Sequence, residues 1–458
     1  MALRWLTVDR LIMLIAWILL FTLAYQQTSI QSDTWWQIRA GQQILQSGQV
    51  PTQDSYSWTF PNAYWPNHEW LAEVIFYGSY ALGGTPLLLL ACAALITLTW
   101  VCLFLIGDGQ ALIRLIVIAI GISGHILIWS ARPHLFSLLF LAVTLLLLNR
   151  PRRHWLYPLL FLVWANTHAN VAVGGVVLGA ACITAVIIER RVNWRWLIVS
   201  AASAGATLIN PLGFGLWEYV LYAFRDPARG QILKSEWLPP SLDFPQSYPF
   251  FGIALLWIAA IWLKRRQPKT HADWTILLVS IIFFILGLQS IRHTALFIVA
   301  AIPIMMPHWP VKQPATHPRV LIGAGSLIVL IGVIAWSGIQ LITFWNDHRN
   351  DQAMSPSMIQ AVQSCNGNLF NTYEAGGMLI WMLPERKIFI DNRQDPYPIE
   401  FLAQVANTQM NGDYRALFAS YRISCAVMEA DLPLFNALQR DGWQELYRDS
   451  QWAVLRQQ

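Results

Sequence analysis

The chain has 458 residues, of which 56% are hydrophobic and only 12% are charged, and its formal net charge is +5. A soluble globular domain carries about 25% charged residues, so the composition excludes an ordinary soluble protein and indicates a polytopic membrane protein. The excess Arg and Lys residues lie in short loops between apolar runs. The positive-inside rule accounts for them, and the charge is therefore no sign of nucleic-acid binding.

Eleven apolar runs predict transmembrane helices, although several are shorter than the roughly 20 residues that a perpendicular span needs. Short spans must be tilted, broken or shielded by neighbouring helices, because unpaired backbone cannot face lipid. We interpret the first run as a retained span, since it has no small-residue cleavage site of a signal peptide. The predicted spans are residues 11–25, 86–106, 113–130, 134–149, 155–166, 170–188, 196–210, 248–263, 274–290, 294–307 and 320–342.

The distribution of basic residues predicts a cytoplasmic N-terminus and, because the number of spans is odd, an extracytoplasmic C-terminal segment. On this topology fifteen basic residues are inside: Arg4, Arg10, Arg114, Arg150, Arg152, Arg153, Arg190, Arg191, Arg195, Lys264, Arg265, Arg266, Lys269, Lys312 and Arg319. Six precede residue 345 on the outside: Arg39, Arg132, Arg225, Arg229, Lys234 and Arg292.

Two long outer loops, residues 30–85 and 211–247, interrupt the transmembrane domain of residues 1–344. Apolar residues recur at helical intervals in Ser32–Gln46, Glu69–Leu82 and Leu212–Phe224. This pattern predicts amphipathic helices that lie in the membrane interface.

Residues 345–458 are soluble in composition and predict a small extracytoplasmic α/β domain, because short β runs alternate there with helical patterns. The expected strands are Asn368–Asn371, Lys387–Asp391, Ser424–Glu429, Gln444–Tyr447 and Ala453–Arg456, and the expected helices are Pro356–Ser364, Ile399–Met410, Tyr414–Tyr421 and Pro433–Arg440. Cys365 and Cys425 could pair there if the domain is extracytoplasmic and their geometry permits it.

Polar and ionisable residues at the ends of the apolar runs gather on the predicted outer side. Such residues are costly at membrane depth and usually mark function, so the asymmetry predicts a reaction site that opens on the outer face. They are Asp33, Asp54, Glu69, Glu73, Arg132, His134, Asn166, His168, Asn170, Asn210, Glu236, Arg292 and His293.

Two carboxylates in the first loop are candidate catalytic residues. Asp33 stands at the predicted start of a helix, where it is either an N-cap that contributes about 1 kcal/mol or a partly desolvated general base. Glu69, between His68 and Trp70, is either a second acid or a helix-start charge beside the dipole.

Three short polar motifs are candidate anion sites. Arg132 in R-P-H either reaches to lipid headgroups or binds a phosphate with its planar guanidinium group. N-T-H-A-N, residues 166–170, breaks a helical pattern and indicates either a cavity or a satisfied turn. I-R-H, residues 291–293, is a further polar motif of this kind. No zinc-like spacing joins His68, His134, His168 and His293, so no cofactor is expected, with a divalent metal left open.

The motifs are D-T-W-W, P-x-x-D-x-Y-S-W-T, H-E-W-L-A-E, W-A-N-T-H, L-I-N-P-L-G, N-T-Y-E-A-G-G-M-L-I-W and F-I-D-N-R, which cover essentially the whole chain. They resemble the GT-C superfamily of integral-membrane glycosyltransferases, most closely a group of bacterial GT-C-like membrane proteins. The chain differs from that group at Gln37, where His is usual, and at Asn392, where Gly is usual. The W-W-D motif of oligosaccharyltransferases is absent from its C-terminal segment, which argues against N-glycosylation.

The resemblance implies a glycosyltransferase that moves a sugar from a polyprenyl-phosphate carrier to a saccharide, lipid or protein acceptor at the outer face of the bacterial cytoplasmic membrane. It implies that Asp33 is the acceptor-activating base or, as in some members, a metal ligand, and we expect Glu69 to orient the acceptor or to assist. Substrate or phosphate would be bound by Arg132, His134, His168, Asn170, Arg292, His293, Trp35 and Trp36, with the tryptophans either stacking on sugars or forming an interfacial belt.

Two alternatives remain at this point. One is a catalytically silent subunit or scaffold that docks an envelope protein partner. The other is a flippase for a lipid-linked substrate, which often shows a two-fold repeat of broken helices, and no such repeat is visible in this sequence.

Overall fold

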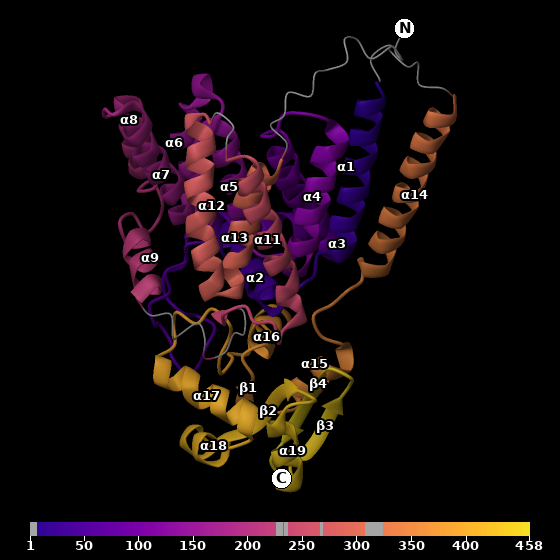
Figure 1. Cartoon of the computed structure of the whole chain (residues 1–458). Helices are drawn as coiled ribbons and strands as arrows, with labels where there is room; N and C mark the ends of the chain where they lie inside the picture. Colours follow the sequence, from indigo (N-terminus) through magenta and orange to yellow (C-terminus); the bar gives the residue numbers. More distant parts are fainter. Residues whose placement is uncertain (1–6, 226–231, 233–236, 266–268, 307–323) are drawn as a thin grey trace. The chain divides into compact units, whose positions relative to one another are not determined.

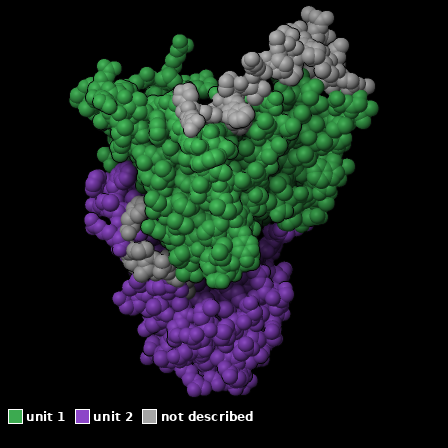
Figure 2. All heavy atoms as spheres, in the orientation of Figure 1, with its two compact units in different colours: residues 1–29, 83–213, 236–349 green, residues 30–82, 214–235, 350–458 purple. Residues whose placement is uncertain are grey.

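The structure is a computed structural model that describes residues 7–225, 232, 237–265, 269–306 and 324–458 (Figure 1). Two compact units divide the chain, coloured separately in Figure 2. Unit 1 comprises residues 1–29, 83–213 and 236–349, and unit 2 comprises residues 30–82, 214–235 and 350–458. Unit 2 therefore contains most of the first long loop, residues 30–82, as well as the C-terminal segment. Arg4, Arg229, Lys234, Glu236, Arg266, Lys312 and Arg319 lie outside the described residues.

Unit 1 is built from apolar helices, and each of the eleven predicted spans contains one. They are α1 (Val8–Gln27), α3 (Trp70–Phe104, from Gly83 onward), α4 (Ala111–His125), α5 (His134–Leu148), α6 (Leu156–Thr167), α7 (Val171–Glu189), α8 (Trp194–Ala206), α11 (Tyr248–Leu263), α12 (His271–Gln289), α13 (Ile291–Met305) and α14 (Ala324–His348). Within the described ranges, seven helices are long and apolar enough to cross a membrane, while α5, α6 and α13 are shorter apolar helices. The predicted polytopic helical fold is confirmed.

Helix α13 shows how unit 1 accommodates a short apolar helix. Its side chains from Thr294 to Pro303 are all buried, and it packs against α4, α5, α11 and α12. Hydrogen bonds between side chains also join neighbouring helices: Thr184 and Thr275 lie 2.7 Å apart between α7 and α12. Such bonds hold helices together in lipid, where apolar surfaces alone give no hydrophobic driving force.

Helix α3 contains a break that separates its two predicted parts. Gly83 and Gly84 have non-helical backbone angles, and Gly84 has a φ of 66°, which glycine adopts without steric cost. The amphipathic stretch before the break belongs to unit 2, and the apolar span after it belongs to unit 1. The separately predicted amphipathic helix and transmembrane span are therefore both present.

Unit 2 contains one mixed sheet among its described residues. The strands are β1 (Asn368–Asn371), β2 (Ile423–Glu429), β3 (Gln444–Arg448) and β4 (Trp452–Arg456), in the order β1-β2-β4-β3. Strand β1 runs parallel to β2, and β4 runs antiparallel to both β2 and β3. The helices are α2 (Ser32–Ser47), the first part of α3, α9 (Gly215–Arg225), α15 (Pro356–Gln363), α16 (Ala375–Met382), α17 (Ile399–Asn411), α18 (Arg415–Tyr421) and α19 (Pro433–Arg440). The expected C-terminal α/β architecture is confirmed.

Two expectations for the C-terminal segment need correction. The predicted strand Lys387–Asp391 is wrong, because its backbone joins no sheet ladder: Ile388 N donates to Tyr56 O at 3.0 Å, and Ile388 O accepts from Trp58 N at 2.9 Å. Helix α16 was not predicted, since two adjacent glycines, Gly376 and Gly377, disfavour an isolated helix.

Cys365 and Cys425 form a disulfide, with their Cα atoms 5.9 Å apart. This separation lies within the usual range for disulfides. The bond joins the segment before β1 to strand β2, so it crosslinks the two chain segments that form the parallel strand pair.

Candidate active site

Asp33 lies in the first turn of α2, and its side chain is only 6% exposed. Gln31 occupies the N-cap position and forms a capping box with Thr34, so the interpretation of Asp33 as the N-cap is wrong. The indole N–H of Trp36 donates to the Asp33 carboxylate at 3.5 Å. Asp33 is thus a largely buried carboxylate that does not serve as the helix cap.

Glu69 is held against the same helix. The Gln37 amide donates to the Glu69 carboxylate at 3.0 Å, and the His68 ring nitrogen lies 4.0 Å from its other oxygen. Gln37 follows Asp33 by four residues, so the two side chains lie on one face of α2. Gln37, which stands where the resembling group usually has His, therefore contacts the second candidate acid, Glu69. The sequence did not reveal this contact.

Trp35 and Trp36 are 8% and 6% exposed. The Trp36 ring packs edge-on against Trp65, with centroids 5.9 Å apart, and Trp35 packs in the same way against Tyr80 at 6.1 Å. These contacts fix the start of α2 in unit 2. Sugar stacking by either ring stays a prediction.

The motifs P-x-x-D-x-Y-S-W-T and F-I-D-N-R meet in a buried ion-pair network. Arg393 Nη2 lies 2.5 Å from Asp54 Oδ1 and 2.6 Å from Asp391 Oδ2, and these side chains are 0% exposed. The Tyr397 hydroxyl donates to Asp391 at 2.9 Å. The guanidinium carbon also lies 4.7 Å from the ring centroid of Tyr56. Asp54, first grouped with the outer polar residues, thus joins the first loop to the C-terminal segment.

Each charged group of this network stabilises the ionised form of its partner. Burial alone would raise the pKa of Asp54, but the charge of Arg393 and hydrogen bonds from Ser57, Arg393 and Tyr56 hold that pKa below its usual value. Burial opposes the charge of Arg393, yet Asp391 and Asp54 raise its pKa well above the usual value. Both groups are therefore ionised at neutral pH, and we assign them to structure rather than to catalysis.

Two motif glycines allow helices to approach α2 closely. A Cβ atom at Gly41 would collide with the backbone carbonyl of Glu73, and one at Gly377 would collide with the backbone carbonyl of Ser32. Glu73 itself is fully buried and accepts a hydrogen bond from Asn67 at 2.8 Å. The two glycines therefore allow α2 to pack closely against α3 and α16.

Unit 1 brings together four of the predicted phosphate-binding residues. Arg132, His168 and Arg292 all act electrostatically on the His134 ring, although they come from three separate regions of the sequence. His134 begins α5, with Nε2 3.1 Å from the Ile128 carbonyl oxygen. The Arg292 guanidinium carbon lies 4.9 Å from the ring centroid of Trp237. The cluster has the cations and donors that a phosphate group requires.

The other predicted polar residues of unit 1 lie beside this cluster in sequence. His293 packs edge-on against Trp237, with ring centroids 6.1 Å apart, and Asn170 is the half-buried N-cap residue of α7. Asn166 donates to the carbonyls of Leu162 and Ile209, both at 2.8 Å. Asn166 is therefore a satisfied structural residue.

His168 is positioned by Trp164, the first residue of the W-A-N-T-H motif, and by Ser137, which the sequence did not single out. Its ring is 3% exposed, and Nδ1 lies 2.8 Å from the Ser137 hydroxyl oxygen. The indole N–H of Trp164 donates to the same oxygen at 2.8 Å. Trp164 lies four residues before His168, but nothing in the sequence places Ser137 beside them.

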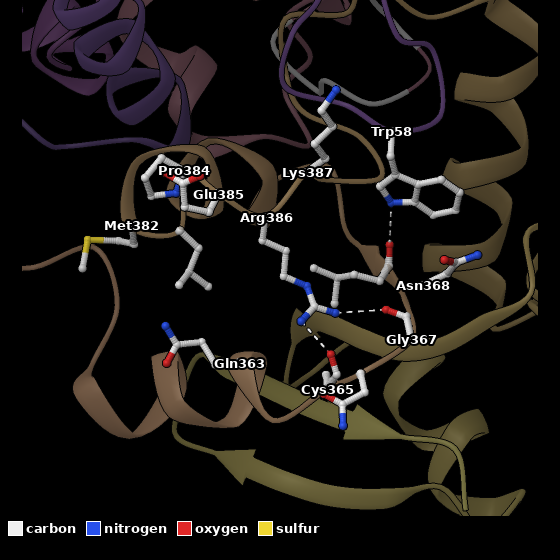
Figure 3. Close-up of a pocket in the computed structure, with 13 residues that line it drawn as sticks. Trp58, Gln363, Cys365, Gly367, Asn368, Met382, Pro384, Glu385, Arg386 and Lys387 are labelled. Atoms are coloured by element: carbon white, nitrogen blue, oxygen red, sulfur yellow. Dashed lines mark hydrogen bonds between the residues drawn. The ribbon is translucent and has the colours of Figure 1, made fainter.

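A separate cavity of about 620 Å³ opens in unit 2 (Figure 3). Arg386 donates to the carbonyls of Cys365 at 2.6 Å and Gly367 at 3.1 Å on its wall, and the Trp58 indole donates to Leu369 O at 3.2 Å. None of the predicted site residues lines it. Within the described ranges, no three His, Cys, Asp or Glu side chains gather as metal ligands.

The chain has the fold of the GT-C membrane glycosyltransferases. ArnT from Cupriavidus metallidurans bound to undecaprenyl phosphate is similar over 99% of this chain and 98% of its own, with a TM-score of 0.52 and 16% identity. The oligosaccharyltransferase of Archaeoglobus fulgidus, tethered with an acceptor peptide, is similar over 91% of this chain and 69% of its own, with a TM-score of 0.55 and 10% identity. The chain spans 66% of the archaeal enzyme's apo form, with a TM-score of 0.53. No protein-family model and no curated protein sequence matches the chain.

Proposed function

We propose that this protein is a membrane glycosyltransferase that transfers a sugar from a polyprenyl-phosphate-linked donor to an acceptor. The observation that carries the proposal is the cluster of Arg132, His134, His168 and Arg292 in unit 1. Its chemistry fits a phosphate, and the similar ArnT structure holds undecaprenyl phosphate. Asp33 on α2 and Glu69, which Gln37 of α2 holds by a hydrogen bond, supply the carboxylates that such a transfer requires.

In this mechanism Asp33 accepts the proton of the acceptor hydroxyl as that oxygen attacks the anomeric carbon of the donor sugar. The bond between the anomeric carbon and the phosphate oxygen breaks, and its electron pair stays on the phosphate. Arg132 and Arg292 stabilise the negative charge that develops there, which fixed cationic donors do most effectively in a low-dielectric site. Glu69 orients the acceptor, and Gln37 holds its carboxylate in place.

The location of the reaction is also part of the proposal. The disulfide between Cys365 and Cys425 lies in unit 2, and disulfides persist in oxidising compartments. Together with the distribution of basic residues, it supports an extracytoplasmic unit 2 and a cytoplasmic N-terminus in a bacterial cytoplasmic membrane.

Asp33→Asn tests the catalytic assignment in cells that lack the native gene. Cells without an active transferase should accumulate the unused polyprenyl-phosphate sugar, which mass spectrometry of extracted lipids detects and identifies. The wild-type chain should remove this lipid, whereas Asp33→Asn should slow its removal by about 10²- to 10⁴-fold, the usual contribution of a general base.

Asp431→Asn is the matched control, because Asp431 is an exposed carboxylate of the same unit, and it should behave as wild type. Wild-type activity of Asp33→Asn at equal expression would refute the role of this carboxylate. Absence of any accumulated lipid in the deletion strain would favour a silent subunit instead. We propose that the step needs no divalent metal, so chelation by EDTA should leave transfer in purified membranes unchanged.

A further inference from the structure

The cavity of unit 2 offers both apolar and hydrogen-bonding surface (Figure 3). Its volume of about 620 Å³ lies in the range of small-molecule sites, roughly 300–1,000 Å³. Trp58 and Met382, both half-buried, supply apolar surface, whereas Gln363 and Asn366 supply exposed amide groups. Such a lining fits a compact ligand that has apolar faces and hydroxyl groups, as a sugar ring has.

Arg386 is a half-buried cation of this lining, and its position is fixed. Its guanidinium group donates to the carbonyl oxygens of Val362 at 2.9 Å, Cys365 at 2.6 Å and Gly367 at 3.1 Å. A guanidinium group has five N–H donors, so these three bonds leave at least two for a further acceptor. Burial lowers the pKa of Arg386, and within the described ranges no carboxylate acts to raise it. A bound anion would stabilise this charge.

The charges of the lining favour a carboxylate as that anion. Arg386, Lys387 and Glu385 are its charged residues, so two cations and one carboxylate give it a net charge of +1. A carboxylate has a single negative charge and two oxygens that match the planar guanidinium group. A phosphate monoester has about −1.5 to −2 charges at neutral pH, which is more than the lining balances.

We propose that this cavity binds an acidic saccharide, one whose sugar ring carries a carboxylate. The carboxylate pairs with Arg386 and with the exposed Lys387 beside it. The amide groups of Gln363 and Asn366 form hydrogen bonds with the sugar hydroxyls, since an amide both donates and accepts. None of these residues is assigned to sugar transfer, so the ligand of the cavity is independent of the proposed function.

Trp58 gives the sugar ring an apolar surface to pack on. Its indole N–H already donates to Leu369 O at 3.2 Å, so this side chain offers the ring rather than its donor. Phe389 and Tyr421 hold the indole edge-on, with ring centroids 5.6 Å and 5.9 Å away. The aromatic surface is therefore fixed before a ligand binds, which reduces the entropy lost on binding.

Binding is tested by isothermal titration calorimetry of the full chain in nanodiscs. The acidic probe is trigalacturonate, and the neutral probe is its trimethyl ester, which keeps the sugar rings and removes the charge. The wild-type protein should bind trigalacturonate about tenfold more tightly than the ester, the effect of one hydrogen bond to a charged group.

Arg386→Gln should bring the affinities for the two probes close to each other, because only the acidic probe loses its partner. Since Arg386 also holds the carbonyls around it, Lys387→Gln is a second variant, at an exposed residue. It should weaken trigalacturonate binding by about two- to fivefold, as expected for an exposed ion pair, and leave ester binding unchanged. Asn366→Ala should weaken the binding of both probes equally.

Arg440→Gln is the matched control, because Arg440 is an exposed cation of unit 2 that does not line the cavity. It should keep the wild-type affinity for both probes. Equal binding of acid and ester by the wild-type protein, or binding of neither at millimolar concentration, would overturn the proposal. Inorganic phosphate that displaced trigalacturonate at equal concentration would also overturn it, since the cavity would then be an anion site without preference for a saccharide.

Discussion

Unit 1 and unit 2 fix their buried polar residues in different ways. In unit 2, Asp54 and Asp391 are locked by direct ion pairs with Arg393, and all three side chains are 0% exposed. In unit 1, His168 is held by hydrogen bonds that run through Ser137 and Trp164. Both arrangements bury ionisable residues, the first through ion pairs and the second through hydrogen bonds to uncharged side chains.

The difference teaches that burial of an ionisable residue does not by itself indicate function. Asp33 and Asp54 are both buried carboxylates of the first loop, at 6% and 1% exposure. A guanidinium group pairs with Asp54 and neutralises it, and Asp54 therefore serves the structure. The Trp36 indole donates a hydrogen bond to Asp33.

The largest expected effect is on the buried ion pairs. Arg393→Ala leaves two carboxylates of unit 2 without their cation, and breaking a buried pair in this way costs about 3–5 kcal/mol. The variant should show a markedly lower melting temperature for unit 2, measured on the full chain in detergent with a probe such as the near-ultraviolet signal of its tryptophans.

Arg415→Ala provides the comparison, because Arg415 pairs with Asp441 at 3.0 Å on the surface, with its side chain 79% exposed. Exposed pairs of this kind contribute little to stability, so the melting temperature should hardly change. Equal effects of the two variants would contradict the structural role assigned to Arg393.

A smaller effect on stability, but a large one on transfer, is expected from the cations of unit 1. Arg132→Gln and Arg292→Gln should each slow sugar transfer by about 10²- to 10³-fold, the usual loss when one donor to a developing charge is removed. The assay is removal of the polyprenyl-phosphate sugar, normalised to the amount of folded protein.

Arg265→Gln is the control for Arg292→Gln, since Arg265 also lies over a tryptophan, with its guanidinium carbon 4.1 Å from the ring centroid of Trp262. Arg265 is exposed and distant in sequence from the predicted site motifs, so transfer should remain at the wild-type rate in this variant. If Arg265→Gln impaired transfer as much as Arg292→Gln, a general effect of lost positive charge would replace the phosphate assignment.

The helices were predictable because their signals are local. A helix lies in each of the eleven apolar runs, and seven of the described helices are long and apolar enough to cross a membrane. The β runs identified all four strands of the described sheet. The segment at Lys387–Asp391 has the composition of a strand, but its backbone pairs with the first loop across more than three hundred residues of sequence. Local propensity carries no information about such a partner.

The site was predictable by residue type but not by role. Asp54 and Arg393 both lie in motifs noted from the sequence, yet only the structure joins them in one ion pair. Ser137 lies in an apolar run three residues after the R-P-H motif, and no sequence pattern connected it to His168. Polar residues at span ends are visible in a sequence, whereas the hydrogen bonds that set their chemistry depend on tertiary packing.

The smallest expected effect is the pH dependence of the stability of unit 2, and it contrasts two of its carboxylates, the buried Asp54 and the half-buried Glu429. The ion pair with Arg393 lowers the pKa of Asp54 despite burial, so its contribution is present above the unfolded pKa of about 3.9 and is lost as the pH falls through the lower folded pKa. Burial raises the pKa of Glu429, so the folded state takes up a proton first and stability rises as the pH falls from neutral toward about 4.3. The melting temperature of unit 2 should therefore rise slightly on mild acidification and then fall below about pH 4. Burial also raises the pKa of Glu73 in the same unit, so Glu429→Gln should reduce the rise without abolishing it. Asp54→Asn should flatten the fall, whereas a profile unchanged by either substitution would show that other groups control it.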